Sequence, residues 1–222
     1  MNKYQVAEKF VSINGEGQRA GELAVFIRFK GCNLNCGYCD TAWANEAECE
    51  SEELSKEELL DYIRNTGVKN ITLTGGEPLL REGMPELISA ILEDPFYRVE
   101  IETNGSVDLT PYVLLPERPA FTMDYKLPGS GMEDKMLTDN LEKLTKRDTV
   151  KFVVGSRADM ERALEVTEKY NLQGRTAIYF SPVFGRIEPA ELVNFLAENK
   201  LNDMRVQIQM HKVIWEPDKR RV

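Results

Sequence analysis

Three of the four cysteines in the chain, Cys32, Cys36 and Cys39, are spaced C-x3-C-x2-C, a pattern that can hold a metal centre. Thiolates this close together repel one another, and a free thiol has a pKa of about 8.5, so they favour a shared positive centre. Gly31 and Gly37 in the same loop allow the backbone to fold back and direct the sulfurs at that centre. The pattern therefore favours a metal centre over a reduced loop with cysteines placed by chance.

The number of thiols indicates the kind of metal. A structural zinc site normally has about four protein ligands from Cys and His, but Cys49 lies in an acidic run and His211, the only histidine, lies near the far end of the chain. A 4Fe-4S cluster held by three cysteines leaves one iron able to bind a small molecule. Two alternatives without chemistry of their own remain, an iron-sulfur electron carrier and a zinc-stabilised binding module.

Composition narrows the class of protein. At 222 residues, with a formal net charge of −9, the chain fits one domain over residues 1–222. The negative charge opposes nucleic-acid binding, which depends on Lys and Arg displacing counterions. No run approaches the ~20 apolar residues of a membrane span, and the first ten residues lack the apolar core of a signal peptide. We therefore expect a cytoplasmic protein with no nucleic-acid or membrane partner.

Strand-like and helix-like segments alternate along the chain, which is typical of a parallel sheet with crossover helices. Residues 42–53 are acidic and expected to be irregular, and residues 108–119 hold three prolines and no convincing helix. The predicted fold class is α/β, an incomplete TIM-like barrel of about six parallel strands with reduced helices and an accessory strand at each end. Strands are expected at 4–13, 23–29, 70–76, 97–105, 120–126, 149–155, 176–183 and 204–212, and helices at 55–67, 84–94, 133–144, 157–170 and 188–199.

Residues able to do chemistry fall where the predicted strands end, which is the edge where sites assemble in parallel α/β folds. Arg28 lies inside an otherwise apolar strand, so it either faces solvent or serves an anionic ligand. Each cluster alone is explicable as turn chemistry, but five at corresponding ends indicate a site. They are Cys32 to Cys39, Gly75-Gly76-Glu77-Pro78, Glu102-Thr103-Asn104-Gly105, Asp124-Tyr125-Lys126 and Ser181-Pro182.

These residues resemble the radical S-adenosylmethionine (SAM) enzymes. The resemblance rests on the cysteine motif, with Tyr38 directly before its third cysteine, and on GGEP after the next strand, and it covers about residues 24–182. It implies the radical SAM fold, a 4Fe-4S cluster on the three cysteines, and SAM bound at the open iron. It also implies that the reduced cluster cleaves SAM to a 5'-deoxyadenosyl radical, which abstracts a substrate hydrogen.

A narrower resemblance, to the 7-carboxy-7-deazaguanine synthase family, spans nearly the whole chain. It is carried by FVSINGEG, CDT, TGGEPLL, ETNG, DYKLPGSGMED, YFSPV and QMHK. It implies a lyase of queuosine biosynthesis that converts 6-carboxytetrahydropterin to 7-carboxy-7-deazaguanine with loss of ammonia. SAM would be used catalytically, Mg2+ would lie beside the pterin, flavodoxin or ferredoxin would donate electrons, and the enzyme would be a homodimer.

The resemblance also implies roles for individual residues, with the radical chemistry carried by SAM and the cluster and no side chain firmly assigned as catalytic. Cys32, Cys36 and Cys39 would hold the cluster, and Thr41 would place its hydroxyl oxygen on Mg2+, a cation that prefers oxygen ligands. The residues that would bind SAM are Tyr38, Cys39, Asp40, Gly75, Gly76, Asn104, Asp124, Tyr125, Lys126 and Ser181. Those that would bind the substrate are Ile13, Asn14, Gly15, Glu16, Arg28, Thr74 and His211.

The sequence departs from the family pattern in two places. Asn14 stands where many relatives have Gln, and DYK replaces the Ser-Pro-Lys of some relatives, so side-chain contacts of Asp124 and Tyr125 are less secure than backbone ones. A rival interpretation is an activase that installs a glycyl radical on a partner enzyme, because such activases share the cysteine motif and compact size. NGEG, CDT and QMHK favour the pterin enzyme.

Overall fold

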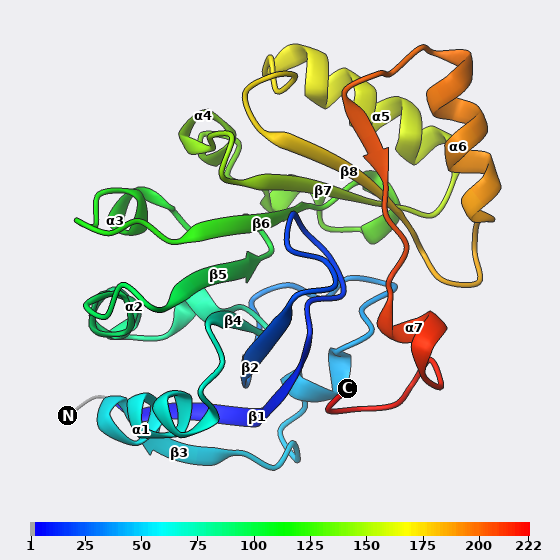
Figure 1. The fold of residues 1–222 in the computed structure, drawn as a ribbon. Helices are drawn as coiled ribbons and strands as arrows, with labels where there is room; N and C mark the ends of the chain where they lie inside the picture. Colours follow the sequence, from blue (N-terminus) through cyan, green and yellow to red (C-terminus); the bar gives the residue numbers. More distant parts are fainter. Residues whose placement is uncertain (1–2) are drawn as a thin grey trace.

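The computed structural model describes residues 3–222, whose nine strands form one sheet in the order β3-β1-β2-β4-β5-β6-β7-β8-β9 (Figure 1). From β2 to β9 all neighbouring strands are parallel, whereas β1 is antiparallel to both β2 and β3. The sheet does not close, so the predicted incomplete barrel is confirmed. The strands are β1 (Lys3–Ile13), β2 (Leu23–Phe29), β3 (Glu52–Ser55), β4 (Asn70–Gly75), β5 (Arg98–Thr103), β6 (Ala120–Tyr125), β7 (Thr149–Val154), β8 (Ala177–Pro182) and β9 (Met204–Val206).

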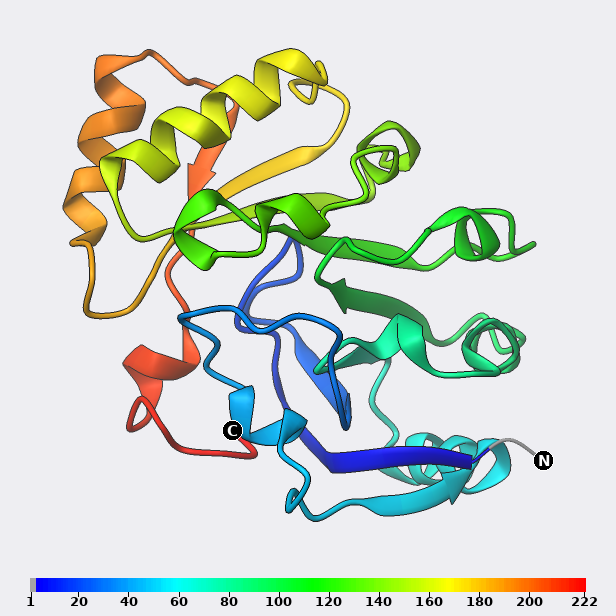
Figure 2. The same cartoon turned by 180° about the vertical axis from the view of Figure 1, so that it is seen from behind.

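Helices cover the outer face of the sheet (Figure 2). In α1 the Ser55 hydroxyl accepts from Glu58 N while the Glu58 carboxylate accepts from Ser55 N, and Gly67 ends the helix at a φ of 64°. The α-helices are α1 (Lys56–Thr66), α2 (Met84–Leu92), α3 (Thr110–Val113), α4 (Asn140–Lys143), α5 (Arg157–Lys169), α6 (Pro189–Glu198) and α7 (His211–Ile214). Short 3-10 turns are η1 (Ala42–Asn45), η2 (Pro78–Leu80), η3 (Pro128–Ser130) and η4 (Glu133–Lys135).

The hydrophobic core lies between these helices and the strands. Every residue of β4 is buried, as expected for a central parallel strand covered on both faces. Leu59 and Ile63 of α1 and Phe195 of α6 are at most 2% exposed, and burying such a side chain contributes about 1.5–3 kcal/mol. This packing fixes the strands, and with them the loops at their carboxyl ends.

Four segments differ from the sequence-based expectation. The strand expected at 204–212 ends at Val206, and residues 211–214 form the short helix α7 instead. Residues 133–144 do not form one helix but η4 and α4, because the Asn140 side chain donates to the carbonyls of Gly105 and Val107 at 3.1 and 2.7 Å and so ties the chain to the loop after β5. Residues 42–53 contain η1 and the start of the edge strand β3. The segment 108–119 was expected to hold no convincing helix, but it contains the single-turn helix α3.

The loop between β1 and β2 crosses the concave side of the sheet. Gly17 has a φ of 76°, and a Cβ at this position would lie 2.6 Å from the Glu100 carboxylate, so glycine is required. Its backbone exchanges hydrogen bonds of 2.8 and 3.1 Å with the Gln207 side chain, which follows β9. The loop thus bridges part of the opening that the sheet leaves. Within residues 3–222, no helix has both the length and the apolar character needed to span a membrane.

Candidate active site

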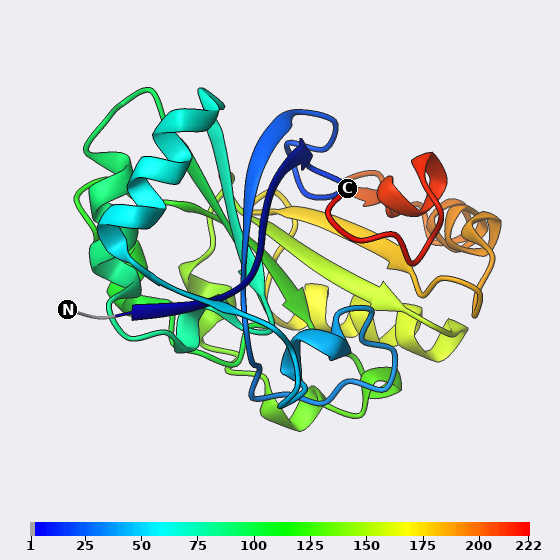
Figure 3. The same ribbon diagram turned by 90° about the horizontal axis from the view of Figure 1, so that it is seen from below.

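One cavity of about 700 Å3 lies at the carboxyl ends of the parallel strands, within the size range of small-molecule sites. Figure 3 shows β6 and β7 pointing toward the cysteine loop, residues 31–41, at this edge. All three cysteines of the motif line the cavity, together with residues from the ends of β1, β2, β4, β5, β6 and β7. The topology therefore brings the strand-end clusters to one place.

The cysteine loop has almost no regular structure, yet its sulfurs have defined partners. The Cys32 Sγ accepts hydrogen bonds from Leu34 N and Asn104 Nδ2, both at 3.4 Å. Hydrogen bonds from N–H groups to sulfur stabilise thiolate and tune the reduction potential of an iron-sulfur cluster. Asn104 therefore contributes to the cysteine end of the cavity through its side chain.

The donor set fits an iron-sulfur cluster. Burial raises the pKa of the Cys36 thiol; the Lys126 ammonium opposes this, while the Cys39 and Cys32 thiols and Asp124 add to it. Such a group of thiols requires a bound cation before all of them ionise. Within residues 3–222, no three His, Cys, Asp or Glu side chains are placed to hold a single metal ion, whereas the thiolates of a cubane bind separate irons.

Two glycines at the end of β4 allow the chain to approach the cysteine loop. A Cβ on Gly75 would lie 2.2 Å from Phe29 O, and one on Gly76 would lie 2.2 Å from Gly31 O. Gly76 N and Glu77 N donate to these same carbonyls at 3.0 Å. Both glycines line the cavity, and their lack of side chains also sets the position from which the cysteine loop departs.

Glu77 organises the loop that follows β5 from a fully buried position. Its carboxylate accepts hydrogen bonds from Leu79 N at 3.0 Å, the Thr103 hydroxyl at 2.9 Å and Asn104 N at 2.7 Å. Burial raises the pKa of Glu77 to about 7, although these donors oppose the shift. The GGEP and ETNG motifs are therefore joined by one carboxylate, which sets the place of Asn104.

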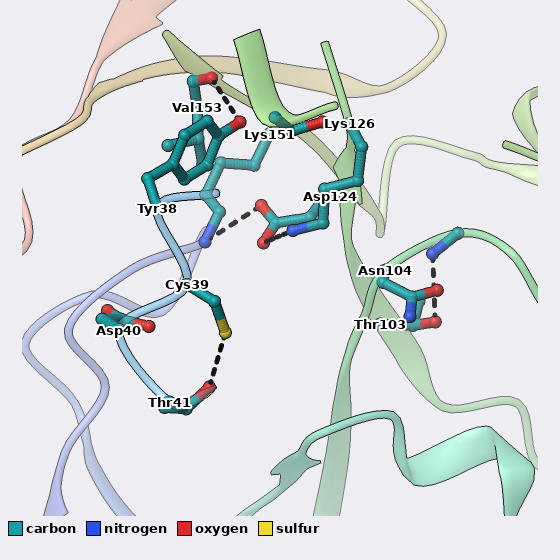
Figure 4. A network of polar contacts seen from close by, with 12 residues as sticks. Tyr38, Cys39, Asp40, Thr41, Thr103, Asn104, Asp124, Lys126, Lys151 and Val153 are labelled. Atoms are coloured by element: carbon teal, nitrogen blue, oxygen red, sulfur yellow. Dashed lines mark hydrogen bonds and ion pairs between the residues drawn. The ribbon is translucent and has the colours of Figure 1, made fainter. Parts of the chain in front are cut away.

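Thr41 has a hydroxyl directed at the cavity rather than at the helix that it precedes. It occupies the N-cap position of η1 but makes no capping bond, and its Oγ1 lies 3.6 Å from Cys39 Sγ (Figure 4). Asp40 is beside it and accepts from Gln209 Nε2 at 3.2 Å. These oxygens suit a hard divalent cation such as Mg2+.

Four charged side chains of the cavity wall are linked by ion pairs, and two of them are lysines that share one carboxylate. The Lys126 and Lys151 ammoniums lie 3.0 and 3.1 Å from the two oxygens of Asp124 (Figure 4). Lys151 also pairs with Glu16. Burial alone would raise the pKa of Asp124, but the two ammoniums outweigh it, so the pKa is lowered. Burial would lower the pKa of Lys151, but Asp124 and Glu16 raise it well above its usual value. Both shifts favour the charged forms of Asp124 and Lys151.

The cavity wall also carries Arg28 and Glu102. Arg28 Nε donates to Glu8 Oε1 at 2.8 Å, so the arginine within the β2 strand is paired and oriented by the neighbouring strand β1. Burial raises the pKa of Glu102 to about 7, while Lys151 lowers it and Glu16 raises it.

Burial lowers the pKa of His211, which Asp40 and Glu16 partly oppose. His211 is close to the first loop, since a Cβ on Gly15 would lie 3.4 Å from its Nδ1.

The cavity wall includes most of the residues singled out from the sequence. They are Ile13, Gly15, Glu16, Arg28, Cys32, Cys36, Tyr38, Cys39, Asp40, Thr41, Thr74, Gly75, Gly76, Asn104, Asp124, Lys126 and His211. Three others are not part of the lining. Asn14 is buried and accepts from the Thr72 hydroxyl at 2.7 Å, Tyr125 packs in the core against Phe152, and the Ser181 hydroxyl donates to Gln207 O at 2.8 Å.

Sequence reasoning missed several charged residues of the wall, among them Glu8 and Lys151. Glu8 lies in β1 and Lys151 in β7, strands whose buried residues are mostly apolar. A charge within such a strand is costly unless it has a partner. Glu8 and Lys151 could therefore have been identified as candidate site residues on the same grounds as Arg28.

Comparison with known proteins agrees with this geometry. Residues 26–199 match the radical SAM superfamily. The chain is 56% identical to the 7-carboxy-7-deazaguanine synthase of Clostridium acetobutylicum, with 99% of each chain covered. It is 37% identical to the 7-carboxy-7-deazaguanine synthase of Leptospira interrogans, with 96% of each chain covered. The crystal structure of QueE from Escherichia coli has a similar fold, with a TM-score of 0.70, 24% identity and coverage of 93% and 94% of the two chains.

Proposed function

Since the chain belongs to the 7-carboxy-7-deazaguanine synthase family of the radical SAM superfamily, we propose that it converts 6-carboxy-5,6,7,8-tetrahydropterin to 7-carboxy-7-deazaguanine and ammonia, a lyase step toward queuosine. The supporting observation is one cavity whose wall holds the three thiols together with Arg28 and Glu102. The atoms of the substrate equal those of the product plus ammonia, and SAM is used catalytically. The reaction therefore consumes no external oxidant.

At the cysteine end, Cys32, Cys36 and Cys39 hold the 4Fe-4S cluster. When bound, the reduced cluster with SAM supplies a radical that abstracts hydrogen from the substrate. Residues that we assign to SAM are Tyr38, Asp40, Gly75, Gly76, Asn104, Asp124 and Lys126, all of which line the cavity. Support for this end comes from the two N–H groups directed at Cys32 Sγ and from the glycines, which leave room for a ligand near the backbone.

Arg28 binds the carboxylate of the pterin. Glu8 holds its Nε, so the remaining guanidinium nitrogens are available for an anion. Glu102, with a pKa of about 7, holds or releases a proton at its carboxylate oxygens near neutral pH. We assign the remaining contacts with the ring to Ile13, Gly15, Glu16, Thr74 and His211.

Mg2+ binds beside the cysteine loop through the Thr41 hydroxyl. The absence of a capping bond at Thr41 supports this, because its oxygen is directed toward the cavity instead. Thr41→Ala should weaken the dependence of turnover on Mg2+ while the visible spectrum of the cluster stays unchanged. A titration of turnover rate against Mg2+ concentration measures this, and an unchanged response would remove Thr41 from the cation site.

We further propose that the enzyme is a cytoplasmic homodimer reduced by flavodoxin or ferredoxin. Four free cysteines support a reducing compartment. Large apolar side chains at the surface, Phe184, Val213 and Ile214, are at least 50% exposed and support contact with a second copy. Sedimentation velocity measures the assembly state, and a monomer at micromolar concentration would contradict the dimer.

The decisive test is an anaerobic assay of cluster-loaded enzyme with reductant, SAM, Mg2+ and 6-carboxytetrahydropterin. We expect equimolar formation of 7-carboxy-7-deazaguanine and ammonia, without net consumption of SAM. If fully loaded enzyme cleaves SAM but yields neither product with this substrate, the proposed function is wrong.

A further inference from the structure

The last six residues, 217–222, form a C-terminal segment on the wall of the cavity. After α7 the chain turns back toward η1 and the end of β1, where the C-terminus lies (Figures 1 and 2). The segment therefore faces the same space as Arg28 and the cysteine loop, although it is far from both in the sequence.

Two arginines of this segment meet one buried carboxylate. The Arg220 guanidinium lies 3.4 Å from the centre of the Trp43 ring, and its Nε lies 3.8 Å from Glu8 Oε2. Arg221 Nε lies 3.8 Å from the same oxygen. The Glu8 side chain is only 3% exposed, and its Oε2 has no hydrogen-bond partner in the part of the chain that the structure describes. Both arginines are close enough for attraction but beyond direct hydrogen-bond distance.

Near Arg28 and the C-terminal segment, positive charges outnumber negative charges by one. Arg28 already pairs with Glu8 Oε1, so three guanidiniums surround one carboxylate. The adjacent Asp218 and Lys219 offset each other, and an ionised Glu102 on the same cavity wall offsets one arginine. One positive charge therefore remains, in a chain whose net charge is −9. A ligand bearing a single carboxylate would balance it.

We propose that Arg220, held against Trp43, joins Arg28 in binding the carboxylate of the cavity's ligand, so that the C-terminal segment forms part of the substrate site. Stacking on an indole suits a planar guanidinium and leaves its nitrogens free to bind an anion. This inference rests on the proposed function for the identity of the ligand, the 6-carboxylate of a pterin. It adds a second arginine to the recognition of that carboxylate and makes the C-terminal segment a determinant of specificity.

Binding without turnover tests this proposal separately from the reaction. Equilibrium dialysis of cluster-loaded enzyme with SAM and Mg2+, but no reductant, gives the Kd of 6-carboxypterin and of pterin, which lacks the carboxylate. We expect the wild-type protein to prefer 6-carboxypterin at least about tenfold, and Arg220→Ala to lose most of that preference, because a hydrogen-bonded charge pair is removed. Arg64→Ala, which removes the same charge from the exposed surface of α1, should keep the preference.

A second measurement checks the position of Arg220 in protein without ligand. Trp43 and Trp215 are the only tryptophans, so a Trp215→Phe background, excited selectively at tryptophan, reports on Trp43 alone. Adding Arg220→Ala to it should change the emission of Trp43, and adding Arg64→Ala should not. Arg221→Ala, which does not stack on the indole, should reduce the carboxylate preference less than Arg220→Ala does.

Three results would overturn the proposal: no carboxylate preference in the wild-type protein, full preference in Arg220→Ala, or a larger loss in Arg221→Ala than in Arg220→Ala. None of them requires turnover. Failure of the enzymatic assay and failure of this inference are therefore distinguishable.

Discussion

The cysteine loop and the C-terminal segment are both irregular, and both face the same cavity, but different forces hold them. The cysteine loop is fixed by backbone hydrogen bonds to three other parts of the chain, from Gly31 N to Ala44 O, from Glu77 N to Gly31 O and from Gly37 N to Ser130 O, at 3.0 to 3.1 Å. The C-terminal segment is held by the stacking of Arg220 on Trp43 and by long ion pairs to Glu8.

This difference suits the role that we propose for each region. A cluster needs ligands in fixed positions, which backbone bonds to packed strands provide. A substrate must enter and leave, and the ion pairs of Arg220 and Arg221 to the buried Glu8 are longer than direct hydrogen bonds, so they open more easily than backbone hydrogen bonds. We call the cysteine loop with its contacts to β4 the rigid wall of the cavity, and the C-terminal segment with its contacts to Trp43 and Glu8 the adjustable wall. Substitutions should affect the two walls differently.

The largest effect is expected where the cysteine loop meets β4. Gly76→Ala would place a Cβ 2.2 Å from Gly31 O, so we expect a loss of about 1–3 kcal/mol in the free energy of unfolding and loss of bound iron. Urea unfolding and iron analysis measure these. The control is Gly37→Ala in the same loop, where a Cβ would have no neighbour closer than 4.0 Å. Equal iron content in the two variants would show that the loop is not rigid.

A second prediction concerns pH. The folded pKa of Glu77, about 7, is above the ordinary value of 4.5 for a glutamate, so between these values the native state binds more protons than the unfolded state. The stabilisation is complete below about pH 4.5 and is lost as pH rises to about 7, by roughly 3 kcal/mol. Glu77→Gln should flatten this dependence of stability on pH, whatever its cost at a single pH.

Urea unfolding of cluster-free protein at several pH values between 4.5 and 7 measures the slope. The wild-type slope should be negative, and the difference between wild type and Glu77→Gln isolates this carboxyl from the others. Parallel plots of the free energy of unfolding against pH for the two proteins would show that Glu77 is ionised throughout this range. The pKa of Glu77 would then not be raised.

The third prediction addresses the adjustable wall. Truncation after Glu216 removes the C-terminal segment, with one cation–π contact and two long ion pairs. We expect the free energy of unfolding to fall by only about 1 kcal/mol, with iron content unchanged. Thermal unfolding and iron analysis measure this. Loss of iron on truncation would show that the two walls are not independent.

The smallest effect is expected at Cys49. Its sulfur donates to Glu50 O at 3.3 Å and is not part of the cavity wall. Cys49→Ser should therefore retain a full complement of iron, whereas Cys36→Ser should not. Iron loss in Cys49→Ser would mean that the ligand set extends beyond the loop.

Much of the rigid wall could be predicted from the sequence, because its signals are local. Apolar runs define the parallel strands, the cysteine spacing defines the cluster loop, and GGEP marks a close approach of backbones. The structure explains why position 76 needs glycine, because a Cβ there would collide with Gly31 O. That contact joins strands β2 and β4, which no local pattern relates.

The adjustable wall could not be predicted, because its signals are not local. The pairing of Glu8 with Arg28 depends on the antiparallel register of β1 and β2, and Arg220 reaches Trp43 across most of the chain. The edge strand β3 was likewise hidden by its charged sequence, since it is stabilised by pairing with β1 rather than by burial. Residues 133–144 have helical spacing, but the side-chain bonds of Asn140 prevail.

The central claim is that three protein thiolates leave one iron of the cluster open. Mössbauer spectra of 57Fe-reconstituted enzyme, recorded with and without SAM, test it most directly. The account predicts that one iron of the cluster changes its isomer shift and quadrupole splitting when SAM is added, while the others stay the same. Spectra that are identical with and without SAM, from a cluster whose every iron has a protein ligand, would contradict it.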